Sequence, residues 1–345
     1  MIDWHREMIG DATRTGAYRR AIFRTVRPGD VVLDLGSGTG ILALFARQAG
    51  AARVYAIERT DMVQIARHLC RANGMTRRVR FLHGLSTELG LPERVDLIVS
   101  EIIGSFGLEE GVLRYLVDAK KRFLKPGGRV LPLELELILA PSEDRTIQDR
   151  LDVWARAEAM YGVNFLPARR LAAAHMYEVG ADPADLLGEP ACLQQIDLSG
   201  VRDMHMRGRV HFEVMRPGRL TGLASWFRAR LAEDIWLSTE PPLRDSSWEN
   251  VFFPLERPLD VRPGDHIDAK VLYLDPFWKW TVEVRDASGA KRAQYAHSTF
   301  QAAPSSGKHA IRRLVSRIPG LSGPARAQLE VAARALYRFS RAIIG

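Results

Sequence analysis

The sequence predicts an α/β domain built on a doubly wound, mostly parallel sheet, followed by an antiparallel β barrel or sandwich. Up to about residue 141, segments with strand character alternate with helical segments, which is typical of a parallel sheet covered by helices. Beyond residue 141, short strands follow one another and are separated by turn pairs such as Pro217-Gly218 and Pro263-Gly264. Strands with little helix between them are typical of an antiparallel β domain.

The expected strands of the first part are rich in aliphatic residues, and they are 31–35, 53–58, 79–82, 95–100 and 129–139. Helices are expected between them, at 41–49 and 60–73. The second part is expected to start with a helix over 146–161 and to continue with strands at 208–215, 221–231, 250–255, 266–274 and 278–286. We therefore expect an α/β domain over 1–141, a β domain over 142–300, and a basic linker with a helical tail over 301–345.

The composition is that of a globular protein and predicts a cytoplasmic location. The chain has 345 residues, of which 46% are hydrophobic and 26% are charged. Its first residues are charged and contain no apolar signal segment, and no apolar run reaches the ~20 residues of a transmembrane helix. The two cysteines, Cys70 and Cys192, have neither metal-binding nor redox spacing, so no metal site is expected.

Positive charge is concentrated in the tail. The net charge is +8, and the residues from Lys308 onward carry eight basic side chains against one acid, Glu330, so the rest of the chain is nearly neutral. From Ser322 onward the tail has helical periodicity, with apolar residues on one face and arginines on another. This helix is expected to pack on the body or on a partner subunit, or else to bind nucleic acid, a membrane surface or an acidic partner.

A glycine-rich turn follows the first expected strand and predicts a binding site for a nucleoside cofactor. Gly36, Gly38 and Gly40 stand at alternate positions, where they allow a sharp turn with no side chain between the backbone and a ligand. The next strand ends in Glu58. A carboxylate at that strand end can accept hydrogen bonds from both hydroxyls of a ribose.

The spacing of these glycines differs from the G-x-G-x-x-G pattern of dinucleotide-binding enzymes, because Ile41 stands where the third glycine would be. Together with Asp34, the turn resembles the first motif of class I S-adenosylmethionine methyltransferases. A plain strand-to-helix turn without a cofactor has the same local pattern and is the alternative.

The fourth expected strand runs into a loop with two glutamates, Glu101 and Glu110. In a continuous helix their side chains would lie on opposite faces, but Gly104 and Gly107 permit a loop that folds back and brings them together. Two adjacent carboxylates repel unless a cation lies between them, and a planar guanidinium can donate paired N–H bonds to both. The loop therefore predicts a guanidinium clamp, with two solvated loop acids as the alternative.

In this order, the motifs resemble those of the protein arginine methyltransferase family. The segments that carry the resemblance are 11–15, 32–46, 56–58, 100–110, 246–248, 253–256 and 261–265. The resemblance implies a class I methyltransferase Rossmann-like domain followed by an antiparallel β barrel, with a helical dimerisation arm at about 150–190 and a head-to-tail homodimer. It also implies S-adenosyl-L-methionine as cofactor and an arginine-containing protein, peptide or small molecule as acceptor.

The resemblance further implies roles for individual residues. Arg14 pairs with the cofactor carboxylate, Met8 shapes the space around the methyl group, and Glu58 holds the ribose. Glu101 and Glu110 clamp the substrate guanidinium. On the substrate side the barrel contributes Trp248 and its neighbour Ser247. The residues expected around the methionine part of the cofactor are Asp34, Gly36, Gly38, Thr39 and Gly40.

Several positions depart from the family pattern and indicate a divergent, bacterial-type member. Ser247 stands where the family has a histidine that pairs with the carboxylate of Asp11, and Thr87 replaces the acid that binds the adenine edge. Smaller side chains, Ile103 and Ser105 among them, stand in the double-glutamate loop. The N-terminal helix with its paired Tyr-Phe, which covers the cofactor in the family, is expected to be mostly absent. Its loss should weaken cofactor binding or leave closure of the site to another segment or to the substrate.

Three functions remain open on the sequence. The first is an S-adenosylmethionine-dependent N-methyltransferase that acts on the guanidinium of arginine in a protein, a peptide or the free amino acid. The second transfers the methyl group to another amine or to a hydroxyl in a biosynthetic pathway. The third is a catalytically weak relative that serves as a binding or scaffold subunit, which the missing histidine and helix would favour.

Overall fold

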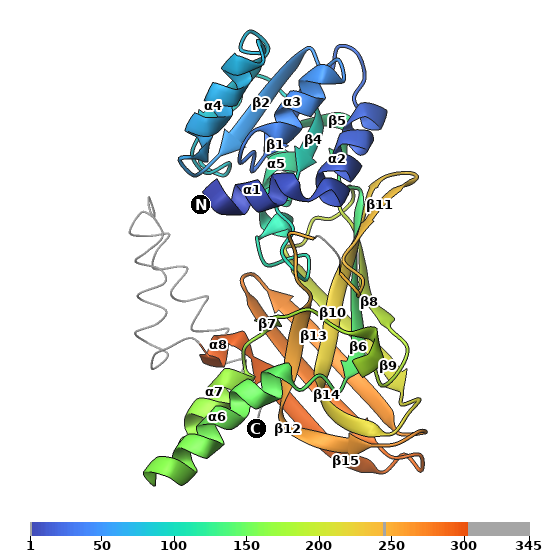
Figure 1. The fold of residues 1–345 in the computed structure, drawn as a ribbon. Coiled ribbons are helices and arrows are strands. Elements are labelled where there is room, and N and C mark those ends of the chain that lie inside the picture. The colour runs from blue at the N-terminus through green and yellow to red at the C-terminus, as the bar shows by residue number, and fades with distance from the viewer. Residues whose placement is uncertain (1, 244–245, 303–345) are drawn as a thin grey trace, which may run out of the picture.

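The computed structural model describes residues 2–243 and 246–302, and these form two parts (Figure 1). An α/β part contains the amino-terminal residues, and a β part follows it, with a helical arm projecting from its side. The predicted tail helix lies in 303–345, outside the described residues, so its role stays a prediction. No helix in the described part of the chain combines the length and the apolar character needed to cross a membrane.

The first part contains a five-stranded parallel sheet, as predicted, with the order β3-β2-β1-β4-β5. Its strands are β1 (Val31–Leu35), β2 (Arg53–Glu58), β3 (Val79–His83), β4 (Val95–Ser100) and β5 (Leu124–Leu131). Val32, Leu33, Leu97 and Ile98 in the central strands are fully buried, as expected for parallel strands covered on both faces. The strand order reverses between β1 and β4, and ligands of such sheets bind beyond the carboxyl ends at that point.

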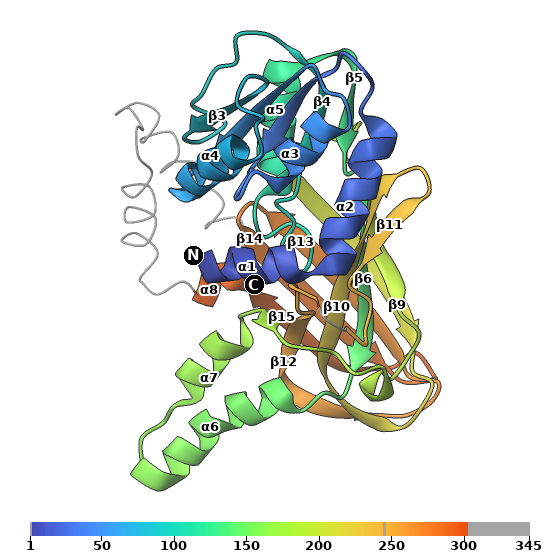
Figure 2. The same cartoon turned by 45° about the horizontal axis from the view of Figure 1, so that its top comes forward.

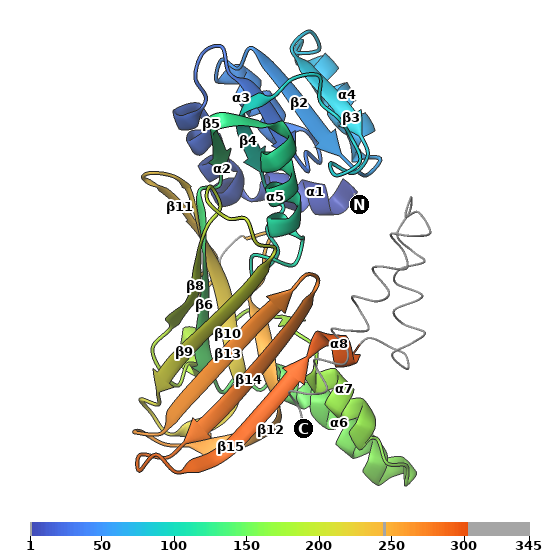
Figure 3. The same cartoon turned by 180° about the vertical axis from the view of Figure 1, so that it is seen from behind.

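Helices cover both faces of this sheet. α3 (Ile41–Gln48) and α4 (Met62–Ala72) lie in front of it in Figure 1, whereas α5 (Val112–Phe123) lies on the opposite face, which Figure 3 shows from behind. α2 (Ala12–Thr25) packs beside α3, and α1 (Ile2–Gly10) lies at the end of the sheet that faces the β part.

The single strand predicted at 129–139 is wrong, because the chain forms two strands there. β5 ends at Leu131, and β6 (Glu134–Ser142) pairs with β8 and β10 of the β part. Pro132 stands between the two strands, and a proline has no N–H to donate to a sheet ladder. The continuous aliphatic run conceals this change of sheet, since both segments are buried and have the same residue types.

The second part is an antiparallel β barrel made of two sheets. The larger sheet has the order β7-β12-β10-β6-β8, with β11 paired to β10, and the smaller has the order β15-β14-β13-β9. The strand bounds are β7 (Tyr177–Glu178), β8 (Ala191–Asp197), β9 (His205–Glu213), β10 (Gly218–Ala232), β11 (Ile235–Ser238), β12 (Val251–Val261), β13 (His266–Leu274), β14 (Phe277–Arg285) and β15 (Lys291–Ser298). Phe253 and Trp280 meet edge to face inside the barrel, with ring centres 5.2 Å apart.

A helical arm leaves the barrel between β6 and β7. It consists of α6 (Thr146–Tyr161), with the bounds that the sequence predicts, and α7 (Leu166–Ala173). Figures 1 and 2 both show the arm projecting away from the barrel. Two short helices complete the described part of the chain, η1 (Pro183–Asp185) and α8 (Thr299–Ala302).

Candidate active site

The turn after β1 has the conformation that its glycines allow. Gly36, Gly38 and Gly40 have φ angles of 78°, 51° and 79°, a region that other residues rarely adopt. The backbone N–H groups of Gly36 and Ser37 donate to the carbonyl oxygen of Ile57 at 3.0 and 2.9 Å. The turn is thereby fixed against the carboxyl end of β2.

Glu58 ends β2 and faces this turn. Its side chain is held at both oxygens: Oε2 accepts a hydrogen bond from the backbone N–H of Gly38 at 2.8 Å. Oε1 accepts two hydrogen bonds from Thr60, one from its N–H and one from its Oγ1, each at 2.7 Å. The residue is 7% exposed. Its carboxylate therefore has a fixed direction at the rim of the sheet.

Several buried polar atoms near the turn have no hydrogen-bond partner among the described residues. Asp34 Oδ2 accepts from the backbone N–H of Ala43 at 2.9 Å, but Asp34 Oδ1, Ser37 Oγ and Arg14 Nε are unpaired. Burial raises the pKa of Asp34 to about 7, and the carboxylate of Glu58 acts in the same direction. Because buried polar groups are nearly always hydrogen-bonded, these atoms fit a ligand that carries both charged and polar groups.

The loop after β4 folds back on itself, as its glycines predict. The backbone N–H of Gly107 donates to the carbonyl oxygen of Gly104 at 2.8 Å, and that of Gly111 donates to Leu108 at 2.9 Å. Gly107 has a φ of 94°, and a Cβ atom there would lie 2.9 Å from Leu137 of the barrel. The positive φ at this turn therefore favours glycine.

Arg14 contacts Glu101, the first residue of the predicted clamp. Its Nη2 donates to Oε2 of Glu101 in an ion pair whose two side chains are 11% and 8% exposed. Burial lowers the pKa of Arg14, and the nearby carboxylates of Asp11 and Glu110 act in the opposite direction. Its guanidinium carbon lies 5.3 Å from the centre of the Trp248 ring, within the range of a cation–π contact. Glu101 and Trp248 thus surround a guanidinium that belongs to the chain itself.

Glu110, the second clamp residue, lies at the end of the same loop. Packing around its carboxyl group raises its pKa although the residue as a whole is exposed, while the cations Arg14 and Arg59 act in the opposite direction. Met8 lies on the other side of Arg14, and its carbonyl oxygen accepts a hydrogen bond from Arg14 Nη1 at 3.0 Å. Glu101 and Met8 therefore contact the same guanidinium, and the charge of Glu110 acts on it without a direct hydrogen bond in the described structure.

Ser247 occupies the place of the expected histidine and keeps its contact. Both its N–H and its Oγ donate to Oδ2 of Asp11, at 2.9 and 3.1 Å, and Asp11 Oδ1 caps α2 by accepting from the N–H of Arg14 at 2.8 Å. The neighbouring Trp248 donates from Nε1 to the carbonyl oxygen of Ile103 at 2.9 Å. Two hydrogen-bonded links therefore join the barrel to the α/β part beside the clamp.

Comparison with known proteins agrees with this geometry. Residues 135–278 match the model of the arginine methyltransferase oligomerization subdomain, and residues 32–128 match that of a methyltransferase domain. The chain is 34% identical over 281 residues to protein arginine N-methyltransferase 6 of Xenopus laevis, which covers 77% of this chain and 82% of the relative. It is 33% identical over 297 residues to protein arginine N-methyltransferase PRMT10 of Oryza sativa subsp. japonica, and this match covers 76% of this chain and 78% of the relative. The chain belongs to the protein arginine methyltransferase family.

Solved structures agree with this assignment. Arabidopsis thaliana protein arginine methyltransferase 10, solved in a uniquely open conformation, matches with a TM-score of 0.74 and 27% identity, over 86% of this chain and 97% of that one. The PRMT1 enzyme-prozyme complex of Trypanosoma brucei matches with a TM-score of 0.76 and 24% identity, and the match covers 85% of this chain and 97% of that one. At this identity the match supports the fold alone. The predictions of the family, of a methyltransferase and of a Rossmann-like domain followed by a β domain are confirmed.

In this arginine methyltransferase α1 lies at the glycine loop, but it does not contain the paired Tyr-Phe of the helix that is expected to be absent, so that expectation stays a prediction. α1 places the His5 ring against Gly38, where an added Cβ atom would lie 2.7 Å from His5 Cε1. Burial lowers the pKa of His5, and the carboxylate of Glu58 acts in the opposite direction. His5 was not among the predicted site residues, because a lone histidine in a charged first turn has no local pattern that marks it.

A second contact at the methyltransferase site was also missed. Ser105, in the double-glutamate loop, donates from Oγ to Oε1 of Glu178 on β7 at 2.8 Å. The negative charge of Glu178 raises the pKa values of both Glu109 and Glu110, in addition to the larger effect of burial. The barrel therefore adds a carboxylate close to the clamp. The two contacting residues are far apart in the sequence, so no local signal could have found the pair.

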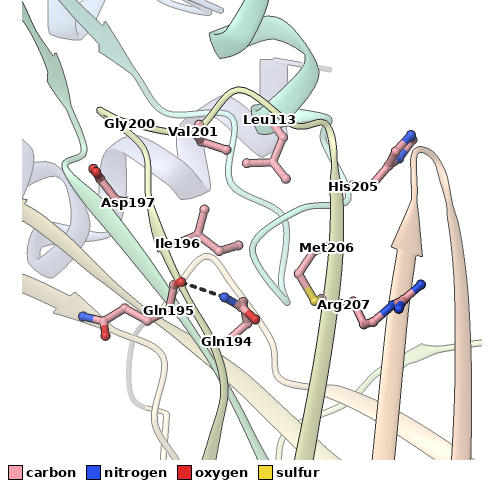
Figure 4. Close-up of a pocket in the computed structure, with 10 residues that line it drawn as sticks. All are labelled: Leu113, Gln194, Gln195, Ile196, Asp197, Gly200, Val201, His205, Met206 and Arg207. Atoms are coloured by element: carbon pink, nitrogen blue, oxygen red, sulfur yellow. Dashed lines mark hydrogen bonds between the residues drawn. The ribbon is translucent and has the colours of Figure 1, made fainter.

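The other predicted cofactor residues lie at the same rim. Thr39 is half-buried within the glycine turn, and Thr87 is exposed in the loop that follows β3. A separate cavity of about 440 Å³, shown in Figure 4, lies between the β8–β9 connection and the start of α5. Its lining includes Gln195, Asp197 and His205 but none of the predicted site residues, so it is not part of the methyltransferase site.

Proposed function

We propose that this chain transfers a methyl group from S-adenosylmethionine to a guanidinium nitrogen of arginine. The observation that carries the proposal is the position of Arg14, whose guanidinium is paired with Glu101, lies in the field of Glu110 and stacks near Trp248. Glu101 and Trp248 hold a planar cation, and Glu110 lies close enough for its charge to act on that cation. A substrate guanidinium offers them the same charge and the same donor geometry.

The residues at the glycine turn suit the proposed cofactor. Asp34 Oδ1 and Ser37 Oγ are buried acceptors that can receive hydrogen bonds from an ammonium group, and Arg14 Nε is a donor for a carboxylate. The carboxylate of Glu58 suits the hydroxyls of a ribose. When bound, S-adenosylmethionine supplies an electrophilic methyl group on a sulfonium.

Transfer requires the two glutamates to orient the acceptor. A free guanidinium is a poor nucleophile because its lone pairs are delocalised. Carboxylates that accept N–H bonds from two of its nitrogens draw positive charge to those nitrogens and leave electron density on the third. A cofactor held at the glycine turn would supply the methyl group to that third nitrogen, which would then release its proton to solvent. Alignment supplies most of the rate enhancement in such a step.

Binding of the cofactor should free the clamp. Arg14 can form an ion pair either with the cofactor carboxylate or with Glu101. Its ion pair with Glu101 must weaken before a substrate guanidinium can bind Glu101. We therefore expect ordered binding, with the cofactor first. The hydrogen bonds from Ser247 to Asp11 support an active enzyme rather than a scaffold subunit, because they attach the barrel loop that carries Trp248 to the α/β part.

Methyl transfer to free arginine, to arginine-containing peptides and to proteins, with the methyl located by mass spectrometry, tests the proposal. Glu101→Gln keeps the shape of the side chain but removes its charge, and we expect the rate to fall about 100-fold. Glu189→Gln, an exposed residue of the β part, is the matched control and should leave the rate unchanged. Methyl on an oxygen or a non-guanidinium nitrogen, or full activity of both Glu101→Gln and Glu110→Gln, would contradict the proposed acceptor.

We also infer that two copies of the chain associate through the arm. Met160, Tyr161, Val163 and Val153 on or next to α6 are 71%, 68%, 53% and 50% exposed, an apolar surface that association would bury. The oligomerization subdomain matched by residues 135–278 includes this arm. The exposed apolar residues of the α/β part, such as Phe23 and Leu69, could receive it.

Light scattering on the full chain measures the association. The wild type should be a dimer, and Met160→Glu with Tyr161→Glu should give a folded monomer, because burying two carboxylates in an apolar interface is unfavourable. Met215→Glu changes a residue that is 60% exposed outside the arm, and this control should remain a dimer. A monomeric wild type, or a dimer that survives the arm substitutions, would exclude this interface.

A further inference from the structure

A group of arginines lies at the opposite end of the parallel sheet from the methyltransferase site. A surface cavity of about 480 Å³ is bounded by the first residues of β2 and β3 and by one side of α4. Six arginines line it: Arg53, Arg67, Arg71, Arg77, Arg78 and Arg80. No acidic residue of the described chain is among its lining residues. Figures 1 and 3 show these elements at the end of the α/β part that is remote from the barrel.

Most of these arginines are not neutralised within the described residues. Arg53 pairs with Glu93 at 3.0 Å, and Arg67 is held by the carbonyl oxygen of Phe81 at 3.2 Å. Four arginines of the cavity have neither a carboxylate within 4.0 Å nor a side-chain hydrogen bond in the described structure. They are Arg71, Arg77, Arg78 and Arg80. Like charges at such close quarters repel unless an anion joins them.

The segment that contributes most of these arginines has no acid of its own. Residues 62–87 contain five arginines and no aspartate or glutamate. The chain outside the tail is nearly neutral as a whole, so this concentration of charge is a property of one surface. A concave surface with one sign of charge focuses the electrostatic field and attracts counter-charged ligands.

We propose that this cavity binds the phosphate chain of a polyphosphate ligand, such as a nucleoside triphosphate or free tripolyphosphate. Guanidinium groups bind phosphate oxygens through paired N–H donors, and several of them can engage successive phosphates. The volume lies within the range of small-ligand sites, roughly 300–1,000 Å³. The arginines come from three short segments, which favours a compact anion over an extended polymer.

The aromatic residues of the cavity argue against recognition of a base. Tyr55 and Phe81 line it, but they are only 5% and 9% exposed, and the hydroxyl of Tyr55 donates to Glu93 at 2.8 Å. Single-stranded nucleic acids bind through exposed aromatic rings on which successive bases stack. Since these two rings are covered, affinity should depend on the phosphates, and tripolyphosphate should bind about as well as ATP.

Isothermal titration calorimetry of the full chain at low salt and without magnesium tests this site. We expect ATP and tripolyphosphate to have similar dissociation constants, and AMP and inorganic phosphate to bind at least about tenfold more weakly. The variant Arg77→Gln/Arg78→Gln/Arg80→Gln should weaken tripolyphosphate binding at least about tenfold. Lysine at the same three positions keeps the charge without the paired donors. The affinity of this lysine variant for tripolyphosphate should lie between that of the wild type and that of the glutamine variant.

A matched control separates the cavity from the general positive charge of the chain. Arg202→Gln/Arg219→Gln/Arg257→Gln removes three exposed arginines of the β part and should change the affinity by less than about twofold. Equal losses in both triple variants, or no binding by the wild type, would overturn the proposal. So would a single-stranded oligonucleotide that binds more tightly than ATP and depends on the same three arginines. None of these readouts depends on methyl transfer.

Discussion

The two ends of the parallel sheet carry opposite charges in opposite environments. At the carboxyl ends of the strands, the acids Asp34, Glu58 and Glu101 are buried or nearly so, and each has a defined hydrogen-bond partner. Near the amino end of β3, Arg77, Arg78 and Arg80 are exposed and have no ion-pair partner in the described structure, whereas Arg53 at the start of β2 pairs with Glu93. β2, labelled in Figure 1, connects the two ends, because Arg53 begins this strand and Glu58 ends it.

This difference shows how one sheet can separate chemistry from electrostatic attraction. Burying a carboxylate is unfavourable unless hydrogen bonds and a counter-charge fix it, so the acids at the carboxyl end have set directions. Such fixed groups can orient a reacting guanidinium. The exposed arginines keep their hydration and their rotamer freedom, so they suit ligands held by charge. Substitutions should therefore have large effects at the buried end and small effects at the exposed end.

Arg14→Met should produce the largest change in stability. The substitution leaves Glu101 buried without its cation, and removing one partner of a buried ion pair destabilises a protein by about 4 kcal/mol. Urea unfolding of the ligand-free chain measures this difference. The double variant Arg14→Met/Glu101→Gln removes both charges and should recover most of the loss. If Arg14→Met is as stable as the wild type, then the ion pair does not form in solution.

Asp34→Asn should change how stability depends on pH. Burial raises the pKa of Asp34 to about 7, so the folded protein holds a proton that the unfolded chain, with a pKa near 3.8, has released. Stability contributed by this proton is therefore lost as pH rises from about 4 to 7, by about 2 kcal/mol between pH 5 and 7.

The asparagine variant should lack that part of the slope and should be the more stable protein at pH 8 without cofactor. Thermal unfolding of both proteins at several pH values between 5 and 8 gives the comparison. Parallel curves for the two proteins would show that Asp34 is already ionised when folded. Addition of S-adenosylmethionine should flatten the wild-type curve, because a nearby ammonium group would favour the carboxylate.

The sequence predicted the parts of the site that lie at strand ends. The glycine turn, Glu58 and Glu101 each follow a buried strand, and strand ends of a parallel sheet meet at one edge. It did not predict which partners these groups find in the ligand-free protein. Arg14 and Glu101 are 87 positions apart, and their contact depends on how α1 and α2 pack over the rim.

Contacts between the α/β part and the barrel were also outside the reach of local patterns. Ser247 was expected to mark a lost interaction, yet a hydroxyl and a backbone N–H reach Asp11 where a larger ring was expected. The reason is that the backbone of the barrel loop comes close enough for a short side chain. The strand break at Pro132 was missed for a related reason, since burial on both sides hides the change from one sheet to the other.

The smallest expected change in stability comes from substituting the exposed arginines near the amino end of β3. In Arg77→Gln/Arg78→Gln/Arg80→Gln, unpaired like charges are removed without loss of a described ion pair or buried contact. The midpoint of thermal unfolding should rise by about 1 °C at low salt, and the gain should disappear at high salt, where exposed charges are screened. Tripolyphosphate should stabilise the wild type but not this variant, since a ligand that binds only the folded state raises its stability. A midpoint that falls by several degrees at every salt concentration would instead show that these arginines hold the edge of the sheet together.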